Sequence, residues 1–242
     1  KPGWLEYEQL LAASDGVFER PSIAEGDLLS INYTSGTTSR PKGVMITHRN
    51  AWVNAVGTLA HLPMTPADRF LWSLPMFHAN GWTYTWIVTA AAALHVCLRQ
   101  VDATTVYRLV NQECITMLCA APTVLIAIAS GPEEGRKSLR RGVRVQTAGA
   151  PPAAATIERV EGELGWVITQ VYGLTETAPF ISICAPLPEH DALEPGERAR
   201  IKARQGVELM TSGDLRVVDE EMRDVPRDGV TLGEIVARGN VV

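Results

Sequence analysis

The chain has few of the features that mark secreted or membrane proteins. Its 242 residues include only four cysteines, Cys97, Cys114, Cys119 and Cys184, with no CxxC pair and no regular spacing. This argues against a disulfide framework or a zinc site and predicts buried, reduced thiols. No stretch approaches the roughly 18 unbroken apolar residues of a membrane span. Because the chain begins without a methionine or an apolar signal core, we expect a cytoplasmic fragment of a longer protein.

Runs of positive charge are also absent. The 22 Lys and Arg residues are outnumbered by 27 Asp and Glu, which gives a net charge of -5 and a pI near 5.6. Neither a nucleic-acid footprint nor a polybasic membrane patch is therefore expected. The partners should be small molecules, and the oligomeric state stays open, a homodimer included.

Short apolar runs alternate with segments of helical period along most of the chain. This alternation predicts an α/β fold in which a parallel sheet is covered by helices. The expected strands are residues 28–33, 69–74, 94–98, 115–119, 143–147 and 167–172, and the expected helices are residues 49–61, 81–93, 104–113, 123–130 and 153–164.

The composition changes after Cys184, where prolines and a charged stretch over 189–204 interrupt the pattern. We expect the charged stretch to be solvated surface. Short alternating segments at 213–218 and 233–237 predict antiparallel strands. The predicted organisation is a lead-in segment (1–27), an α/β unit (28–185), and a linker with the start of a β-rich subdomain (186–242).

The strongest local signal is the segment from Tyr33 to Gly43, which follows one apolar strand and precedes another short strand. Its glycines allow close backbone approach, successive amides can form an anion-binding nest, and hydroxyls and a lysine can donate to phosphate oxygens. The donors that we assign to a nucleotide phosphate site are Thr34, Ser35, Gly36, Thr37, Thr38 and Lys42.

Two other interpretations of this segment fit its residues less well. A solvated Ser/Thr/Gly turn is common on protein surfaces, but the Pro41-Lys42-Gly43 ending disfavours it. The P-loop of kinases and GTPases requires GxxxxGK[ST], whereas Gly36 is followed by Pro41-Lys42 with no hydroxyl after the lysine. A different fold must therefore hold the nucleotide.

The segment resembles the signature loop of the AMP-forming superfamily of acyl-CoA synthetases, peptide-synthetase adenylation domains and firefly luciferase. This chain has Ser39 where most members have glycine. Three further motifs follow in the family's order: residues 75–82, residues 147–152 and residues 171–177. The resemblance implies the fold of that superfamily's N-terminal domain and ATP, Mg²⁺ and coenzyme A as cofactors or co-substrates.

The first of these motifs contains Phe77, His78 and Trp82. The resemblance implies that these three residues line the acid pocket, with His78 near the reacting carboxylate. An isolated histidine at such a turn would otherwise be interpreted as structural.

The other two motifs are expected to hold the nucleotide. By resemblance, Gly149, Ala150 and Pro151 form the adenine-binding turn, although a Gly-Ala-Pro-Pro turn by itself is more often a helix start. Tyr172 and Gly173 are expected beside adenine, Thr175 at phosphate and Glu176 at Mg²⁺. One carboxylate beside substrate phosphates is the usual protein contribution to a Mg²⁺ site.

Other residues are expected to have no role in the site. Residues 233–239 resemble the strand pair that leads to the family's ribose-binding Thr-Gly-Asp, so Asp214, which lies upstream, is interpreted as a turn residue. The remaining histidines, His48, His61, His95 and His190, lack metal-ligand spacing and are expected to be structural.

The resemblance implies that the acid is activated as an acyl adenylate and then transferred to a thiol such as coenzyme A. The apolar residues around Trp82 favour a fatty or aromatic acid, and no aspartate for an amino group occurs between Trp82 and Ala93. The family's C-terminal domain with its catalytic lysine has no counterpart here, so we expect this piece alone to bind nucleotide weakly and to catalyse poorly. A degenerate, non-catalytic nucleotide-binding module is the alternative.

Overall fold

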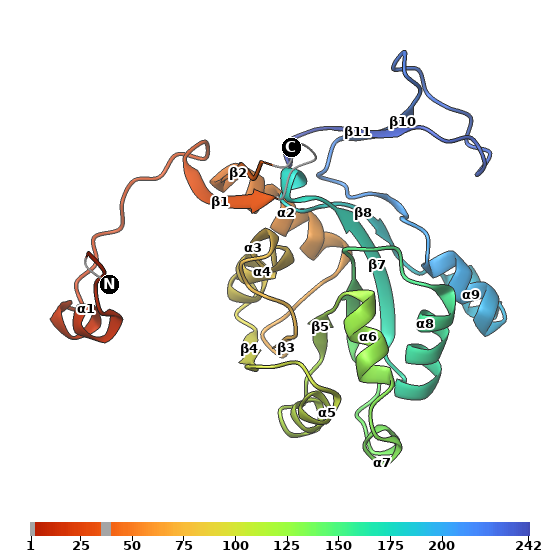
Figure 1. Cartoon of the computed structure of the whole chain (residues 1–242), viewed down its shortest axis with the longest axis horizontal. Coiled ribbons are helices and arrows are strands. Elements are labelled where there is room, and N and C mark those ends of the chain that lie inside the picture. The colour runs from red at the N-terminus through yellow and green to blue at the C-terminus, as the bar shows by residue number, and fades with distance from the viewer. Residues whose placement is uncertain (1–2, 35–39) are drawn as a thin grey trace.

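The computed structural model describes residues 3–34 and 40–242 and is built around a seven-stranded sheet with the order β4-β3-β5-β6-β7-β8-β9 (Figure 1). The strands from β4 to β7 are parallel, and β8 and β9 continue the sheet antiparallel. Their bounds are β3 Arg69–Trp72, β4 Leu94–Cys97, β5 Met117–Cys119, β6 Arg144–Thr147, β7 Val167–Gly173, β8 Phe180–Cys184 and β9 Val207–Glu208. The mixed α/β fold with a mostly parallel sheet was predicted.

Helices cover both faces of the sheet. They include α2 His48–His61, α4 Tyr84–Ala90, α5 Ala103–Gln112, α6 Pro122–Ala129, α8 Ala154–Arg159 with its π-helical continuation Val160–Leu164, and α9 Pro195–Lys202. The other helices are α1 Tyr7–Ala13, α3 Ala79–Trp82 and α7 Glu133–Lys137, with 3-10 turns at Thr175–Thr177 and Pro188–Ala192. The helices α2 and α5 begin within one residue of their predicted starts. Thr47 and Asn50 form a capping box at α2, and Asp102 caps α5.

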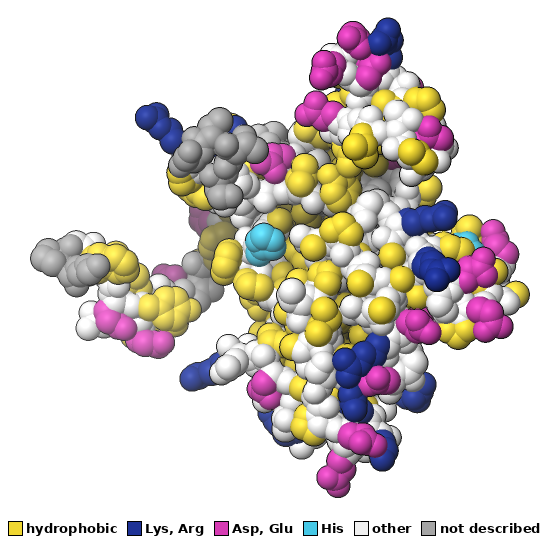
Figure 2. All heavy atoms as spheres, turned by 45° about the vertical axis from the view of Figure 1, so that its right-hand side comes forward, with side chains coloured by type: hydrophobic (Ala, Val, Ile, Leu, Met, Phe, Trp, Pro, Cys, Tyr) yellow, Lys and Arg dark blue, Asp and Glu magenta, His cyan; other side chains and the backbone are white. Residues whose placement is uncertain are grey.

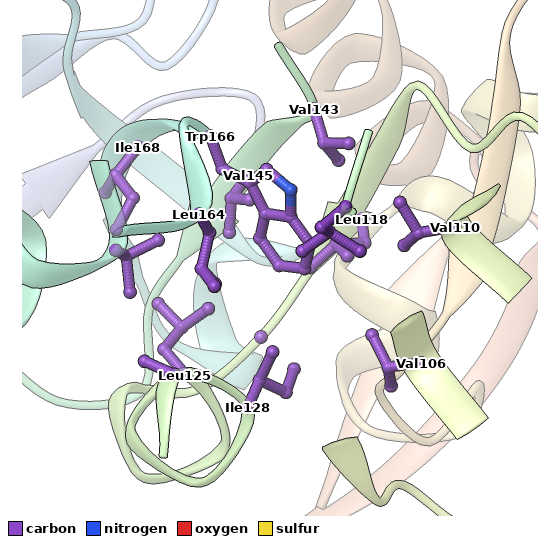
Figure 3. Close-up of a cluster of buried hydrophobic side chains, with 14 of the residues drawn as sticks. Val106, Val110, Leu118, Leu125, Ile128, Val143, Val145, Leu164, Trp166 and Ile168 are labelled. Atoms are coloured by element: carbon purple, nitrogen blue, oxygen red, sulfur yellow. The ribbon is translucent and has the colours of Figure 1, made fainter. Parts of the chain in front are cut away.

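Successive residues of a strand pack into two separate hydrophobic cores, one on each face of the sheet. On β3, Leu71 packs with α5, α6 and α8, whereas Phe70 and Trp72 pack with α2 and α4. Because each face needs its own apolar residues, the central strands are continuous apolar runs. In the first core Trp166 is buried among aliphatic side chains from both strands and helices (Figure 3). The strands are thereby fixed, and their ends can position side chains.

A buried carboxylate ties together the amino ends of three strands. Asp68 accepts a 2.7 Å hydrogen bond from Thr116 Oγ1 and pairs with Arg144 at 2.5 Å. The backbone N–H of Thr65 also donates to it at 2.8 Å. Burial raises the pKa of Asp68, but the bonds from Thr116 and Thr65 and the charge of Arg144 outweigh burial and hold the pKa below its ordinary value.

The first predicted strand is not part of the central sheet, so this prediction was wrong. β1 Leu28–Thr34 pairs antiparallel with β2 Lys42–Thr47 as a separate hairpin. Polar residues Ser30, Asn32 and Thr34 occupy alternate positions of β1. A strand buried on both faces of a parallel sheet is continuously apolar, and this alternation fits a hairpin instead.

The last part of the chain also differs from expectation in places. β10 Asp214–Val218 and β11 Glu234–Arg238 pair antiparallel, as predicted, and Asp214 begins a strand opposite Arg238 instead of lying in a turn. The stretch 189–204 is not merely solvated, because it contains α9, whose Lys202 is 5% exposed and pairs with Glu161 at 2.6 Å. The antiparallel strand β8 was not predicted.

Two further predictions need correction. The helix expected at residues 81–93 begins only at Tyr84 and ends at Ala90, since the residues before it form a left-handed turn. All four cysteines are free, but only Cys119 and Cys184 are buried, where burial raises the pKa of each thiol; Cys97 and Cys114 are exposed.

The segment before β1 extends away from the rest of the chain as an arm that carries α1 (Figure 1). Apolar side chains cover much of this arm (Figure 2), and Tyr7, Val17 and Phe18 are exposed. Within residues 3–34 and 40–242, none of the helices combines the length and apolar character needed to cross a bilayer.

Candidate active site

The β1–β2 hairpin presents two of the predicted phosphate-site residues together. Thr34 and Lys42 are directly paired across the hairpin, so their side chains leave the same face. Thr34 is half-buried and Lys42 is exposed. The predicted donors Ser35, Gly36, Thr37 and Thr38 lie outside the described residues.

The connection after β3 carries His78 into the site on an unusual turn. Residues 79–83 all have positive φ, between 38° and 64°, and only Gly81 among them is a glycine. A left-handed conformation costs roughly 1–2 kcal/mol for each other residue, so the surrounding structure must hold the turn. The carbonyl of Asn80 accepts a 2.9 Å bond from Thr85 Oγ1. His78 precedes the turn and is exposed.

The connection after β6 is a second turn with an exposed glycine. Gly149 has φ of +86° and no neighbour within 4 Å of where a Cβ would stand. Ala150 and Pro151 follow it and are also exposed, whereas Thr147 at the end of the strand is buried. Backbone groups are therefore accessible at this turn.

The connection after β7 is tightly folded around a close backbone contact. A Cβ on Gly173 would lie 1.8 Å from the carbonyl oxygen of Pro179. That carbonyl also accepts bonds from the Leu174 backbone N–H at 3.1 Å and from Thr177 Oγ1. On the next strand, the Phe180 carbonyl accepts a 2.7 Å bond from the Asn54 side chain of α2. These contacts fix the short turn that carries Thr175 and Glu176.

All three connections leave the carboxyl ends of the parallel strands. The chain moves from β3 outward to β4 and then returns past β3 to β5, so the order of the strands reverses there. Ligands of open α/β sheets bind in the crevice at such a reversal.

A cleft of about 470 Å³ lies at this edge. Predicted residues from all four segments meet in it: Thr34, Lys42, His78, Trp82, Gly149, Gly173, Thr175 and Glu176. A groove of about 530 Å³ adjoins it and shares Thr34, His78, Ala79 and Thr175 with it. The predicted substrate residue Phe77 lines this groove. Ala150, Pro151 and Tyr172 line neither cavity.

Five residues of the cleft were given no role in the sequence analysis, although three of them lie within its motifs. They are Ala79, Ala148, Leu174, Pro179 and Phe180. Phe180 stands edge-on to Trp82, with ring centroids 6.1 Å apart. The short, mostly apolar run of residues 180–184 was the signal that could have placed Phe180 on a strand beside β7.

The cleft contains opposite charges that are not neutralised by protein partners. In the described part of the chain, neither Lys42 nor Glu176 forms an ion pair with another residue. The described residues also contain no cluster of three His, Cys, Asp or Glu side chains that could enclose a metal alone. A single carboxylate beside hydroxyls fits Mg²⁺ held jointly with phosphate oxygens.

Another concave region, of about 770 Å³, lies between residues 23–25, the start of α2 and Asn240. Its charged residues Glu25 and Arg49 are paired with each other. It is the larger of the two regions, but it lies away from the carboxyl ends of the strands, so we place the candidate site in the 470 Å³ cleft.

Three histidines outside the cleft make hydrogen bonds within the fold. His61 Nε2 accepts from the Met210 backbone N–H at 3.1 Å, His95 Nδ1 from Trp72 Nε1 at 3.0 Å and His190 Nδ1 from the Leu187 backbone N–H at 3.2 Å. His48 lines the concave region beside α2.

A lysine, hydroxyls and exposed glycine turns around a cleft at the carboxyl edge of a parallel sheet are typical of nucleotide-binding α/β proteins. The chain belongs to the AMP-binding enzyme family, which it matches over residues 2–242.

Individual relatives agree with this assignment. The chain is 45% identical over 241 residues to "Probable acyl-activating enzyme 9" of Arabidopsis thaliana, covering 98% of this chain and 43% of the relative. It is 43% identical over 245 residues to acetate–CoA ligase CCL3 of Humulus lupulus, covering 100% of this chain and again 43% of the relative. The chain thus spans less than half the length of these curated relatives. The ATP-bound structure of MatB from Rhodopseudomonas palustris matches with a TM-score of 0.80 at 25% identity, over 97% of this chain and 44% of that one.

Proposed function

We propose that this chain is the nucleotide- and acid-binding part of an enzyme that activates a carboxylic acid with ATP. An acid oxygen bonds to the α-phosphorus of ATP as the bond to pyrophosphate breaks, giving an acyl adenylate. The sulfur of coenzyme A then bonds to the acyl carbon and AMP leaves. The observation that carries the proposal is the meeting of Lys42, His78 and Glu176 in one cleft of an AMP-binding family member.

In this mechanism the side chains position and neutralise, and none of them forms a bond to the substrate. Two anions, a carboxylate and a triphosphate, must be held together in line. The ammonium of Lys42 offsets charge on the departing pyrophosphate, and the hydroxyls of Thr34 and Thr175 donate to phosphate oxygens. The imidazole of His78 orients the acid carboxylate at the junction of the cleft and the groove.

Glu176 is the residue that would hold Mg²⁺. Its carboxylate is exposed in the cleft and shares the wall with Thr34 and Thr175. Bound Mg²⁺ would neutralise phosphate charge during transfer.

The acid subsite is proposed to take a fatty or aromatic acid. Trp82 and Phe180 form an apolar wall of the cleft, and Phe77 adds an exposed aromatic ring in the groove. Between Trp82 and Ala93 there is no carboxylate to pair with an amino group, which disfavours an amino acid substrate.

The test is acid-dependent exchange of labelled pyrophosphate into ATP by the protein at the full length of its gene. The acid panel should run from acetate through longer fatty acids to aromatic acids. Lys42→Ala and Glu176→Ala should each lower the rate about 100-fold or more, the usual effect of removing a transition-state charge contact. Lys137→Ala and Glu220→Ala, which change exposed residues outside the cleft, should leave it unchanged.

The outcomes separate two classes of protein. Exchange with a subset of acids identifies the substrate class and supports the enzyme. If ATP binds but no acid supports exchange, the proposal fails in favour of a non-catalytic nucleotide-binding module.

A further inference from the structure

The inner face of β1 is polar, which is unusual for a strand that packs on a protein. Ser30, Asn32 and Thr34 are half-buried, whereas Ile31 and Tyr33, at the alternate positions, are 49% and 75% exposed. A strand that packed through the hydrophobic effect would show the reverse pattern. The half-buried polar groups of this face therefore need hydrogen-bond partners.

That partner is the side chain of Asn80, 50 residues further along the chain. Its Oδ1 accepts hydrogen bonds from Ser30 Oγ and from Asn32 Nδ2, both at 2.8 Å. Asn32 Nδ2 also approaches Ser30 Oγ at 3.4 Å. One amide oxygen thus joins two alternate residues of β1 to the turn after β3, and Figure 1 shows the hairpin beside α3.

The turn that carries Asn80 is held firmly on its other side. A Cβ at Gly81 would lie 2.6 Å from the Trp72 ring, so the backbone lies against the indole. Trp72 Nε1 in turn donates to His95 Nδ1. The left-handed turn is therefore supported on both sides, by β3 and by the hairpin.

Each end of this link carries a different part of the cleft. Thr34 continues the same polar face of β1, and Lys42 is paired with it, so the hairpin supplies the phosphate contacts. His78 and Ala79 immediately precede Asn80 and supply the acid side. The amide of Asn80 connects these two parts directly.

We propose that Asn80 is a positioning residue that sets the acid subsite at His78 in register with the phosphate subsite at Thr34 and Lys42. The inference rests on the proposed function. Its consequence is that Asn80 governs the alignment of the two substrates without contacting either of them. A displacement of about 1 Å between reacting groups can cost about 100-fold in rate.

A simpler role is that asparagine merely tolerates the left-handed conformation. Glycine tolerates that conformation better still. Asn80→Gly therefore keeps the backbone and removes the amide, and Asn80→Asp keeps an oxygen that can accept both bonds. The double variant Ser30→Ala/Asn32→Ala removes the donors and leaves the turn's own sequence intact.

The experiment measures kcat and KM for acid-dependent pyrophosphate exchange in these variants of the full-length protein. Asn80→Gly should lower kcat about 30- to 100-fold while KM for ATP and for the acid change less than about threefold, because each subsite still binds its own ligand. Asn80→Asp should recover most of the loss. Combining Asn80→Gly with the double variant should lower kcat no further than Asn80→Gly alone, because both changes remove the same hydrogen bonds.

Three results would overturn the inference. They are a wild-type kcat in Asn80→Gly, a change in that variant confined to KM, or a kcat loss in the combined variant equal to the product of the losses in Asn80→Gly and in Ser30→Ala/Asn32→Ala. If Asn80→Gly fails to fold by circular dichroism, the Ser30/Asn32 double variant decides the question. Hydrogen exchange at the amides of residues 79–83 in that variant tests the link without activity. Loss of protection there supports it, and unchanged protection rejects it, even if the wild-type protein shows no exchange with any acid and the proposed function fails.

Discussion

The two ends of the parallel sheet differ in whether their charged side chains are paired within the protein. At the amino ends, Asp68 is enclosed by Thr116, Arg144 and the Thr65 backbone. At the carboxyl ends, Lys42 and Glu176 share a cleft, and neither has an ion-pair partner within the described residues. A charge that is satisfied by the protein stabilises the fold, and a charge left for a ligand does not. The contrast separates residues that maintain the sheet from those available for chemistry.

The largest expected effect tests how tightly the carboxyl end is built. In Gly173→Ala the new Cβ would meet the Pro179 carbonyl oxygen at 1.8 Å and its carbon at 2.6 Å, both backbone atoms. The loop must move, and we expect a loss of about 3 kcal/mol or more in the free energy of unfolding, measured in urea. Loss of exchange activity should accompany it, since Gly173 lines the cleft.

Gly162→Ala is the matched control for this substitution. Gly162 lies within the helical segment Val160–Leu164 and has nothing within 4 Å of the added Cβ. A gain of up to about 1 kcal/mol is expected there. Equal stability of the two variants would contradict the close approach at Gly173.

The next prediction concerns the amino end. Asp68→Asn removes the carboxylate that pairs with Arg144 and accepts the Thr116 and Thr65 bonds. We expect a loss of about 2 kcal/mol in unfolding free energy, as for other charged hydrogen bonds, with exchange activity within about twofold of wild type. Asp191→Asn, at an exposed position, should change neither quantity. A large loss of activity at unchanged stability in Asp68→Asn would contradict the assignment of Asp68 to the fold instead of the active site.

The same substitution has a defined pH dependence. The folded pKa of Asp68 lies below its ordinary value of 3.8. A depressed carboxyl pKa contributes stability that is present above 3.8 and is lost as the pH falls through the folded value. The stability difference between wild type and Asp68→Asn should therefore be constant near neutral pH and shrink below pH 3.8. A difference that grew on acidification would have the wrong sign.

Local signals in the sequence were sufficient for the central strands and the helices that cover them. Continuous apolar runs predicted β3 to β7, and two of the predicted helices, α2 and α5, have side-chain caps in the structure. The polar alternation of β1 argued against a place in the central sheet, but its contact with Asn80, about 50 residues further along the chain, has no local signal. β8 was missed although residues 180–184 carry a strand signal, because that segment is only five residues long and follows Pro179 directly.

The candidate site was predicted in composition better than in conformation. The order of the motifs predicted that Lys42, His78, Thr175 and Glu176 would lie together, and the cleft contains all four. Residues 81–83 of the left-handed turn were predicted as the start of a helix, since the φ values of this turn depend on Trp72, Thr85 and β1 and not on local propensity. Tyr172, expected beside adenine, does not line the cleft.

The smallest expected effect concerns an aromatic ring that contributes to the site and not to the fold. Phe77 is 77% exposed and lines the groove beside His78. In Phe77→Ala the unfolding free energy should change by no more than about 0.5 kcal/mol. The KM for a bulky apolar acid should rise about three- to tenfold with kcat unchanged, the scale of one lost apolar contact.

Trp52→Ala is the control that gives this result its meaning. Trp52 is also an exposed aromatic residue, at 67%, but it lines the 770 Å³ region beside α2. Its removal should leave the KM for the acid unchanged. If Trp52→Ala raised that KM and Phe77→Ala did not, the acid would bind beside α2. The smaller cleft at the sheet edge would then not contain the whole active site.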